Sequence, residues 1–479
     1  GSGKSWVAVL AATVLDRDLA LVVAPAATLH HLREVHATLS DLFDVRPAQM
    51  ASYSAVSTDR HALENTLLKM GGTEKNTVII FDEAHFLKSF SAARTKRVLR
   101  FLQDHREMPV VVLSGTMTAK SIMDFRERTF LPTEWRTLKS WASVIDNTPE
   151  PPHPTLLAQV GRVIGRSDHR SGARRNFAAW LRAAPGVALA NDEDVGASLY
   201  VSGLSRNTKV SDVLRKALRT ASAEGCSPEG RIWESGADAA RDLCHLALGF
   251  YYRWDWPGDQ PDVLWLTARN RWSGYVRTYL DAKRLRSDPD SPALLAGEME
   301  RNATSFPQPM RRAWDMWTAE RHKDAPPSVP VWLDTSQPAA LVEAAIAAAG
   351  TDRLTVWYQS RAVVDQLERS GYRVFRAGQA PPNDGELACL SVRAHGTGLN
   401  LQAWNTAFVL EPPAGAAAWE QMIARHHRSG QESDSVTFYV NTTTHQLRKR
   451  LTTALDAARY VSQTTGLPQR LTSAIWTPF

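Results

Sequence analysis

The chain has 479 residues, a formal net charge of +6 and a pI near 9.2, with 43% hydrophobic and 22% charged residues. This length predicts two or three domains, and the composition is typical of a soluble globular protein. No apolar run approaches the roughly 20 residues that span a bilayer and no signal peptide opens the chain, so we expect a cytoplasmic protein with no membrane partner. The three cysteines (Cys226, Cys244 and Cys389) are odd in number and widely spaced, which indicates neither a disulfide framework nor a zinc site.

The first residues match the end of a phosphate-binding loop. Gly3, Lys4 and Ser5 fit the last three places of G-x-x-x-x-G-K-[ST], in which backbone N–H groups hold phosphates, Lys reaches the β- and γ-phosphates and the hydroxyl binds Mg²⁺. The leading glycine of this pattern would lie before residue 1, so we expect a sequence that starts inside the motif and belongs to a longer protein. Gly1 is then a loop glycine, although Gly1 and Ser2 could instead derive from cloning.

A parallel α/β pattern follows over residues 1–134. We predict helices over residues 6–15, 28–39 and 61–70, and strands over residues 19–23, 45–52, 77–81 and 109–113. Asp82 and Glu83 directly follow the buried strand 77–81, and Ser114, Gly115 and Thr116 follow strand 109–113. In an open α/β sheet, ligands bind beyond the carboxyl ends of the strands, so these residues are expected to face a site. A solvated acidic turn would be the alternative if Asp82 and Glu83 stood without the phosphate-loop residues.

The middle of the chain, residues 135–330, is rich in Trp and Arg and is predicted to be mainly helical, with Pro clusters as connectors. Basic stretches at 162–175 and 269–286 fit phosphate contacts, but a solvated helix face is the stronger interpretation for each. The tryptophans in this region are expected to lie in the core.

A second α/β pattern covers residues 331–479. Strands are predicted over residues 354–358, 372–375, 387–392, 406–410 and 436–440, with helices over 361–370, 416–425 and 445–461. A glycine-containing loop, RAHGTGLN, occupies residues 393–400. The predicted fold class is therefore α/β, with two parallel-sheet lobes separated by a mainly helical insertion.

The most specific motif is QMIARHHRSGQ at residues 421–431. Arg425 and Arg428 are three residues apart at a helix end, so both side chains can point the same way. Two guanidinium groups suit a γ-phosphate, where negative charge builds as its bond to the β-phosphate breaks. Together with Lys4 and the acids Asp82 and Glu83, this pair predicts a nucleotide-hydrolysing site.

These motifs, DEAH, the following SGT, RAHGTGLNLQ and QMIARHHRSGQ, occur in the order found in superfamily-two helicases. The two glutamines that bracket R-x-H-R-x-G make the chain most similar to the Swi/Snf-type, chromatin-remodeller-like DNA translocases. The resemblance covers both α/β regions and implies RecA-like lobes, an ATP-binding lobe over 1–134, an insertion over 135–330 and a helicase lobe over 331–479. A bacterial or phage origin is expected from the composition.

The resemblance also implies roles for individual residues. Lys4 and Ser5 would bind phosphates and Mg²⁺, Asp82 would hold the metal through water, and Glu83 would orient or deprotonate the attacking water. Arg428 would be the arginine finger and Arg425 its companion. Further residues would bind nucleotide or nucleic acid, or couple the two: Gly1, Gly3, Pro25, Ser114, Gly115, Thr116, Gly396, Thr397, Gly398, Asn400 and Gln421.

The chain departs from this family at two places. A Gly pair is usual where Ala394, His395 and Gly396 stand, and an Asp followed by Trp-Asn-Pro is usual where Glu411, Pro412 and Pro413 stand. A divergent member is therefore expected, an ATP- and Mg²⁺-dependent motor on double-stranded DNA. A strand-separating DNA or RNA helicase, the motor of a restriction or recombination system, and a non-catalytic nucleic-acid clamp remain alternatives, the last disfavoured by the intact motif set.

Overall fold

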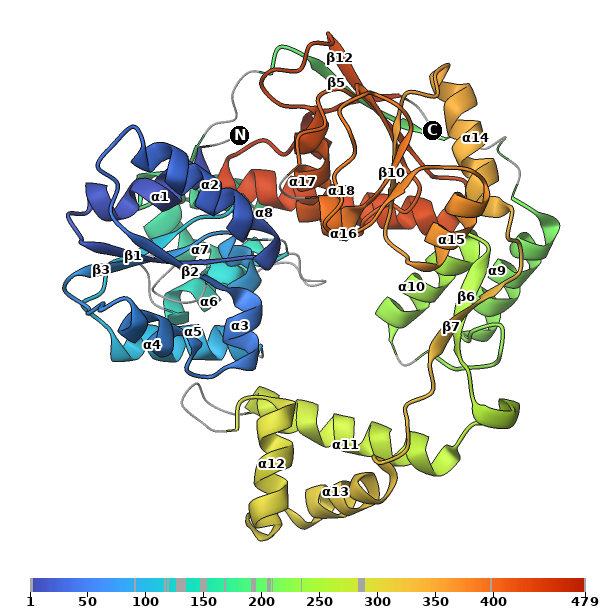
Figure 1. Ribbon diagram of the computed structural model, residues 1–479, viewed down its shortest axis with the longest axis horizontal. Coiled ribbons are helices and arrows are strands. Elements are labelled where there is room, and N and C mark those ends of the chain that lie inside the picture. The colour runs from blue at the N-terminus through green and yellow to red at the C-terminus, as the bar shows by residue number, and fades with distance from the viewer. Residues whose placement is uncertain are drawn as a thin grey trace. The chain divides into compact units, whose positions relative to one another are not determined.

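The computed structural model describes residues 3–89, 92–115, 118, 120–125, 135–146, 153–167, 169–190, 195–204, 208, 210–233, 235–282, 289–396 and 399–477. The chain forms two compact units. The amino-terminal unit comprises residues 4–114 and 253–329, and the carboxy-terminal unit comprises residues 1–3, 115–252 and 330–479. Each unit is mixed α/β and contains one fully parallel sheet (Figure 1).

The amino-terminal unit is built on a four-stranded sheet in the order β2-β1-β3-β4. Its strands and helices are α1 (Lys4–Val14), β1 (Leu19–Ala24), α2 (Leu29–Ser40), β2 (Ala48–Ser52), α3 (Tyr53–Thr58), α4 (Ala62–Lys69), β3 (Thr77–Phe81), the 3₁₀ turn η2 (Ala84–Leu87), α5 (Ala93–Asp104) and β4 (Val110–Val112). Every residue of β3 is buried, as its continuous apolar run predicts. Helices α1 and α2 lie on one face of the sheet, and α3, α4 and α5 lie on the other (Figure 1).

The second part of this unit is a three-helix module, α11 (Val263–Ala282), α12 (Pro292–Asn302) and α13 (Gln308–Glu320). The module has its own apolar core, in which Trp272 and Trp314 pack 4.8 Å apart between ring centroids. Trp265 is also buried, so these tryptophans are core residues, as predicted. A two-stranded sheet of β6 (Phe250–Trp254) and β7 (Ser328–Trp332) lies where the chain passes from one unit to the other.

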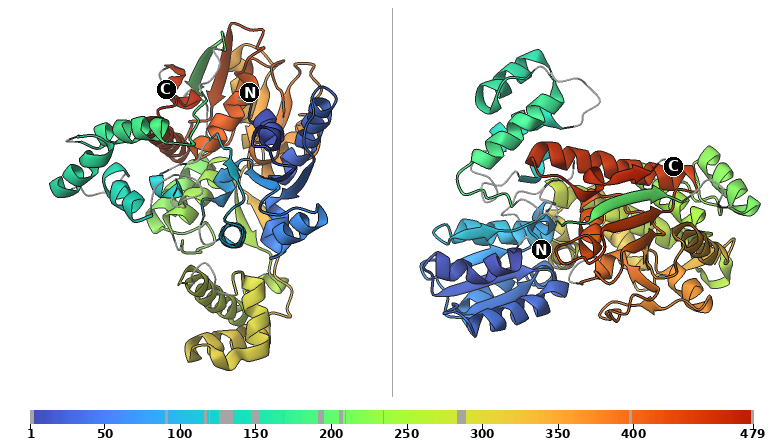
Figure 2. Two further views of the ribbon diagram at one scale, coloured as in Figure 1. Left: turned by 90° about the vertical axis from the view of Figure 1, so that its left-hand side faces the viewer. Right: turned by 90° about the horizontal axis from the view of Figure 1, so that it is seen from above.

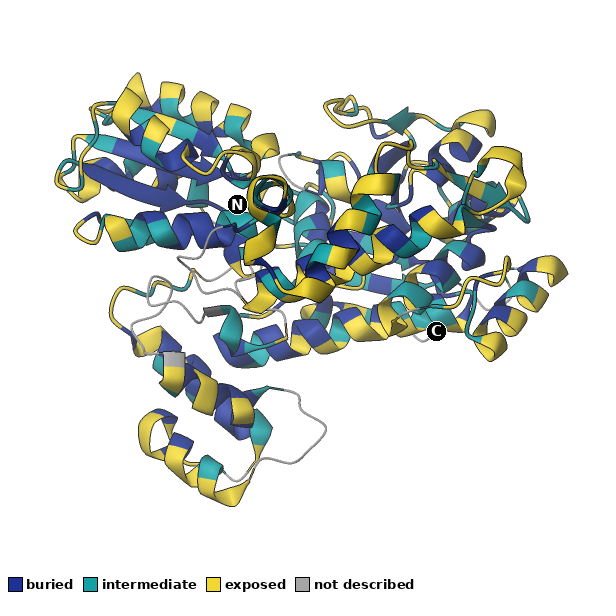
Figure 3. Cartoon of the chain, turned by 90° about the horizontal axis from the view of Figure 1, so that it is seen from below, coloured by how far each residue is buried: buried dark blue, intermediate teal, exposed yellow. Residues whose placement is uncertain are grey.

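The carboxy-terminal unit is built on a seven-stranded sheet in the order β13-β5-β12-β11-β8-β10-β9. From residue 330 onward its elements are α14 (Gln337–Ala349), β8 (Thr355–Tyr358), α15 (Ala362–Arg369), β9 (Val374–Phe375), β10 (Ala388–Ser391), α16 (Val392–His395), β11 (Thr406–Val409), α17 (Ala416–His426), β12 (Ser435–Val440), α18 (His445–Thr465), α19 (Arg470–Ser473) and β13 (Ile475–Thr477). Trp419 of α17 and Leu451 of α18 pack on one face of the sheet, while Leu341 of α14 and Val363 of α15 pack on the other. Figure 3 shows buried and exposed residues alternating around the helices, with the exposed ones on their outward sides.

The described middle region is mainly helical, as predicted, but it also contributes a strand to the large sheet, which was not predicted. Its elements in this unit are η3 (Ile122–Phe125), α6 (Trp135–Ile145), α7 (Pro154–Ile164), α8 (Arg170–Ala183), β5 (Ser198–Gly203), α9 (Asp212–Glu224) and α10 (Gly236–Ala247). Strand β5 pairs in parallel with β12 and with β13, so it is an integral strand of the large sheet. The alternation Leu199-Tyr200-Val201 is too short to separate a strand from a helix segment, which is why the sequence did not reveal it. The helices α6, α7 and α8 stand out in Figure 2 as a group in the colours of residues 135–183.

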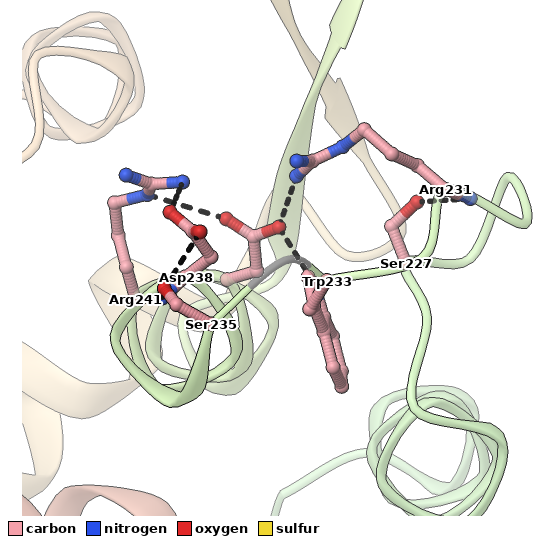
Figure 4. A network of polar contacts seen from close by, with 7 residues as sticks. Ser227, Arg231, Trp233, Ser235, Asp238 and Arg241 are labelled. Carbon is pink, nitrogen blue, oxygen red and sulfur yellow. Dashed lines mark hydrogen bonds and ion pairs between the residues drawn. The ribbon is translucent and has the colours of Figure 1, made fainter. Parts of the chain in front are cut away.

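A polar network fixes the hairpin 226–233 against α10 (Figure 4). The carboxylate of Asp242, which is 7% exposed, accepts hydrogen bonds from Trp233 Nε1 at 2.9 Å, from Arg241 Nε at 3.4 Å and from Arg231. Because a buried carboxylate is stable only when its oxygens are paired, the hydrogen bonds from Arg231 and Trp233 hold the hairpin against α10.

The cysteines and the helices of the described residues bear on two expectations from the sequence. The three cysteines are free thiols, and two of them are buried. No helix of the described chain combines the length and the apolar character that crossing a membrane would need.

Candidate functional site

The parallel register brings the predicted residues of the amino-terminal unit to one edge of its sheet. Val23 is paired with Phe81, and Phe81 with Val112, so β1, β3 and β4 end at the same level. Pro25, Asp82 and Ser114 follow these three ends and therefore share the carboxyl edge, as the strand pattern predicts. Pro25 itself forms the turn into α2, where its carbonyl accepts hydrogen bonds from the backbone and the hydroxyl of Thr28.

Lys4 is the first residue of α1, and its ammonium group points to the same edge. Its Nζ lies 3.6 Å from Glu83 Oε1, which joins the phosphate-loop residue to the acid that follows β3. Gly3, just before the helix, has a φ of +67°, a left-handed conformation that favours glycine. Ser5 lies in the first turn of α1 and is half-buried. Gly1 lies outside the described residues.

The backbone turns sharply at Glu83. Its φ and ψ are 51° and 48°, one of three left-handed non-glycine residues in the described chain. Such a conformation is uncommon for a residue with a Cβ and is found preferentially at functional sites, where neighbouring contacts hold it. Here His85 Nδ1 lies 3.1 Å from Glu83 Oε2 and 3.4 Å from the hydroxyl of Ser114. The SGT serine and the DEAH acid are thus linked through His85, a residue to which the sequence prediction gave no role.

The two neighbouring acids have opposite pKa shifts. Burial, and secondly the charge of Glu83, raises the pKa of Asp82 to about 6. Burial also raises the pKa of Glu83, but the hydrogen bond from His85 and the charge of Lys4 outweigh this effect and the net pKa is lowered. Glu83 is therefore ionised at neutral pH, and the buried Asp82 carboxylate lacks a compensating cation of its own.

This donor set fits a magnesium–nucleotide complex. Mg²⁺ prefers carboxylate, hydroxyl and water oxygens and usually binds proteins through one or two side chains together with phosphates. Asp82 and Ser5 supply such oxygens, and a bound cation would offset the burial and the neighbouring Glu83 charge that raise the pKa of Asp82. Lys4 and the amide groups at the start of α1 suit phosphate oxygens. The described residues contain no group of three or more His, Cys, Asp or Glu side chains that would hold a metal without such phosphates.

Replacing Asp82 by Asn is expected to stabilise the protein at alkaline pH. Because the pKa is raised in the folded state, the native carboxyl group binds its proton more tightly than the unfolded one between about pH 4 and 6, and its ionisation destabilises the fold above this window. The shift corresponds to a gain of up to about 3 kcal/mol in the free energy of unfolding at pH 8 and about half of that at pH 5. Urea unfolding of the parent and of Asp82→Asn at both pH values measures the gain, with the exposed Asp18→Asn as control. A gain that is equal at the two pH values contradicts the assignment.

In the carboxy-terminal unit, Arg425 and Arg428 differ in their surroundings. Arg425 Nε donates to the carbonyls of Gly396 at 3.1 Å and Gln421 at 3.3 Å, and its Nη1 donates to Leu399 O at 3.2 Å. The side chain of Arg428 is half-buried and forms no hydrogen bond or ion pair with any described residue. The sequence predicted that both arginines could point the same way. The structure shows that Arg425 donates to carbonyls of the glycine loop, whereas the side-chain donors of Arg428 have no partner among the described residues.

The glycine loop is also anchored by one of its own residues, His395. His395 is 2% exposed; its Nδ1 accepts the backbone N–H of Ser391 at 3.1 Å, and its Nε2 lies 3.2 Å and 3.0 Å from the carbonyls of Arg376 and Gln379. This histidine therefore occupies a structural position in the second sheet's unit. Of the other predicted residues, Asn400 is exposed, Gln421 is half-buried and Gly115 ends a described segment. Thr116, Thr397 and Gly398 lie outside the described residues.

Glu411, noted in the sequence only as a departure, is fully buried at the end of β11. Its carboxylate accepts hydrogen bonds from the backbone N–H of Ser360 at 2.8 Å and from the Ser360 hydroxyl at 2.7 Å. Burial raises the pKa of Glu411, although these hydrogen bonds oppose the shift. The glutamate thus fastens the turn after β8 to the turn after β11, at the carboxyl edge of the second sheet.

Comparison with known proteins gives little further assignment. No protein-family model matches the chain, and no curated protein matches it. Among solved structures, 211 chains match, and one of them is the crystal structure of the C-terminal part of the Fun30 ATPase domain. That match has 11% sequence identity and a TM-score of 0.27, and it covers 56% of this chain and 98% of the other. At this level of similarity, the function must be inferred from the site itself.

Proposed function

We propose that the protein is an ATP-driven motor that hydrolyses ATP in order to move on double-stranded DNA. The observation that carries the proposal is the meeting of Lys4 and Glu83 at the carboxyl edge of the first sheet, with Asp82 beside them. Hydrolysis of a nucleoside triphosphate requires three groups on one side of the nucleotide: a phosphate-binding lysine, a buried metal-binding acid and an ionised acid.

Each residue then has a defined chemical task. Lys4 would leave Glu83 and bind the β- and γ-phosphates, and Asp82 and Ser5 would hold Mg²⁺, which would supply positive charge to the phosphate oxygens. Glu83, whose lowered pKa keeps it ionised, orients the attacking water and accepts its proton. Arg428 supplies the positive charge that stabilises the transition state. Its guanidinium makes no hydrogen bond or ion pair with the described residues, so no such contact has to break before it binds a phosphate.

The proposed motor activity rests on the link between the catalytic turn and the SGT serine. The contact of Ser114 with His85, and of His85 with Glu83, gives a physical connection from the acid of the proposed nucleotide site to Ser114. Binding or hydrolysis of ATP at the site can therefore change the conformation of the chain after β4, as a motor requires. Contacts to DNA would be made mainly to the backbone and would weaken with salt.

The test is ATP hydrolysis by the intact protein with and without double-stranded DNA, single-stranded DNA or RNA. We expect stimulation by double-stranded DNA, displacement of a triplex-forming strand, and no separation of a plain duplex. Because Asp82 must be ionised before it can hold the metal, kcat/KM for Mg²⁺–ATP should fall as the pH drops below about 6. Duplex unwinding would establish a strand-separating helicase instead, and no hydrolysis under any of these conditions would refute the proposal.

A further inference from the structure

Helix α5 carries a run of buried basic residues that the proposed chemistry does not use. Lys96 and Arg97 are 1% and 5% exposed, and both lie on the helix that directly follows the DEAH turn. At the start of the helix, Arg94 Nε donates to Phe86 O at 2.8 Å and the Thr95 hydroxyl donates to Leu87 O at 3.2 Å. The first turn of α5 is therefore fastened to η2. A buried cation is costly unless it is paired, so the partners of Lys96 and Arg97 show what the helix holds.

Arg97 joins the three-helix module to α3. Its Nε and Nη2 donate to the two carboxylate oxygens of Asp290, at 3.2 Å and 3.0 Å, and the side chain of Asp290 is fully buried. Its Nη1 donates to the carbonyls of Val56 at 3.0 Å and Ser57 at 2.8 Å, in α3. Arg100 also pairs with Asp290. A planar guanidinium in a bidentate pair has a fixed orientation, so a displacement of Asp290 must move Arg97 against α3.

Lys96 provides a second attachment to the same module. Its Nζ donates to Leu280 O at 2.7 Å, in the last described turn of α11. The basic residues of α5 therefore hold the end of α11 and the segment just before α12. Through these contacts, α5 attaches the three-helix module to the part of the unit that contains the four-stranded sheet.

Helix α3 in turn contacts the catalytic turn. Tyr53, its first residue, is 3% exposed and donates its hydroxyl to the backbone carbonyl of Asp82 at 2.9 Å. Its ring stacks on Phe86 with centroids 5.4 Å apart and planes inclined by 4°. Asp82 O belongs to the peptide that precedes Glu83, so this hydrogen bond supports the left-handed backbone at that residue.

We propose that Arg97 and Tyr53 are positioning residues that couple the α11–α13 module to the Asp82–Glu83 turn. The connection runs from Asp290 through Arg97 to α3, and from Tyr53 to Asp82, entirely through buried hydrogen-bonded contacts within one unit. A change in the position of the module thereby alters the geometry of the catalytic acids. The consequence for turnover rests on the proposed function, whereas the coupling between the two segments does not.

Hydrogen exchange of the intact protein tests the coupling without any activity. Tyr53→Phe removes one hydroxyl and keeps the ring stack, and Asp290→Asn removes the charge that orients Arg97. Because coupling between two sites is reciprocal, Tyr53→Phe should speed amide exchange at the start of α12 about threefold or more, and Asp290→Asn should do so at residues 82–87. The matched controls are Tyr275→Phe and Glu298→Gln, which lie on the same module and are more exposed.

ATP hydrolysis gives the second measurement. Both Tyr53→Phe and Asp290→Asn should lower kcat about tenfold with little change in KM for ATP, while the two controls match the parent. If each substitution speeds exchange only around itself, the coupling is refuted, whatever the activity. If the exchange effects are reciprocal but the parent does not hydrolyse ATP, the coupling stands and the proposed function fails. If Asp290→Asn does not fold, the amide exchange rate at the start of α12 in Tyr53→Phe tests the coupling by itself.

Discussion

Replacing Glu83 by Gln is expected to lower kcat for ATP hydrolysis about a thousandfold while ATP binding is retained. The carboxylate of Glu83 is kept ionised by His85 and Lys4, so it can accept a proton from water, whereas the amide of Gln cannot. General-base groups typically contribute factors of a hundred to ten thousand. Steady-state hydrolysis at saturating DNA, together with fluorescent-nucleotide binding, measures the two quantities separately.

The control for this variant is Glu34→Gln, on the exposed surface of α2 of the same unit. It should behave as the parent in both measurements. An equal loss in the two variants, or unchanged turnover in Glu83→Gln, would show that Glu83 is not the base. Loss of nucleotide binding with Glu83→Gln would instead mean that its main task is to hold Lys4 in place.

Replacing Arg428 by Ala should also lower kcat about a thousandfold, at the lower end of the range for arginine fingers. The loss should come without a loss of stability, because the side chain of Arg428 forms no hydrogen bond or ion pair with the described residues. Arg425→Ala should lower stability by about 1–3 kcal/mol, since it leaves the carbonyls of Gly396 and Leu399 without their donor.

Thermal unfolding and DNA-stimulated ATP hydrolysis of the two variants separate these roles. Arg428→Ala should melt with the parent, whereas Arg425→Ala should melt several degrees lower. If Arg428→Ala retains full turnover, or if it is destabilised as much as Arg425→Ala, the assignment of Arg428 as the catalytic arginine is incorrect. Arg425→Lys gives a further check, because a lysine cannot reproduce the forked hydrogen bonds to both carbonyls.

The sequence by itself determined most of the elements and the residues at the strand ends. Strand β3 was predicted over 77–81 and is found there, and helix α18 begins at His445 as predicted and extends four residues beyond the predicted end at Val461. Continuous apolar runs and helical periodicity are local properties, so they can be read without knowledge of the partner elements. Once parallel pairing is assumed, the residues after β1, β3 and β4 must share one edge, and this placed Pro25, Asp82 and Ser114 correctly.

Only the tertiary structure decided the long-range partners. Strand β5 pairs with β12, more than two hundred residues away in the chain. This pairing uses the backbone hydrogen-bonding groups of β12, and a local sequence pattern does not show which distant strand will offer them. The different surroundings of Arg425 and Arg428 depend on where the carbonyls of the glycine loop lie, and the pairing of Arg97 with Asp290 depends on how α5 meets the α11–α13 module. Residue types and spacing therefore fix which groups can do the chemistry, while the partners that orient or occupy those groups are set by packing between elements that are distant in the chain.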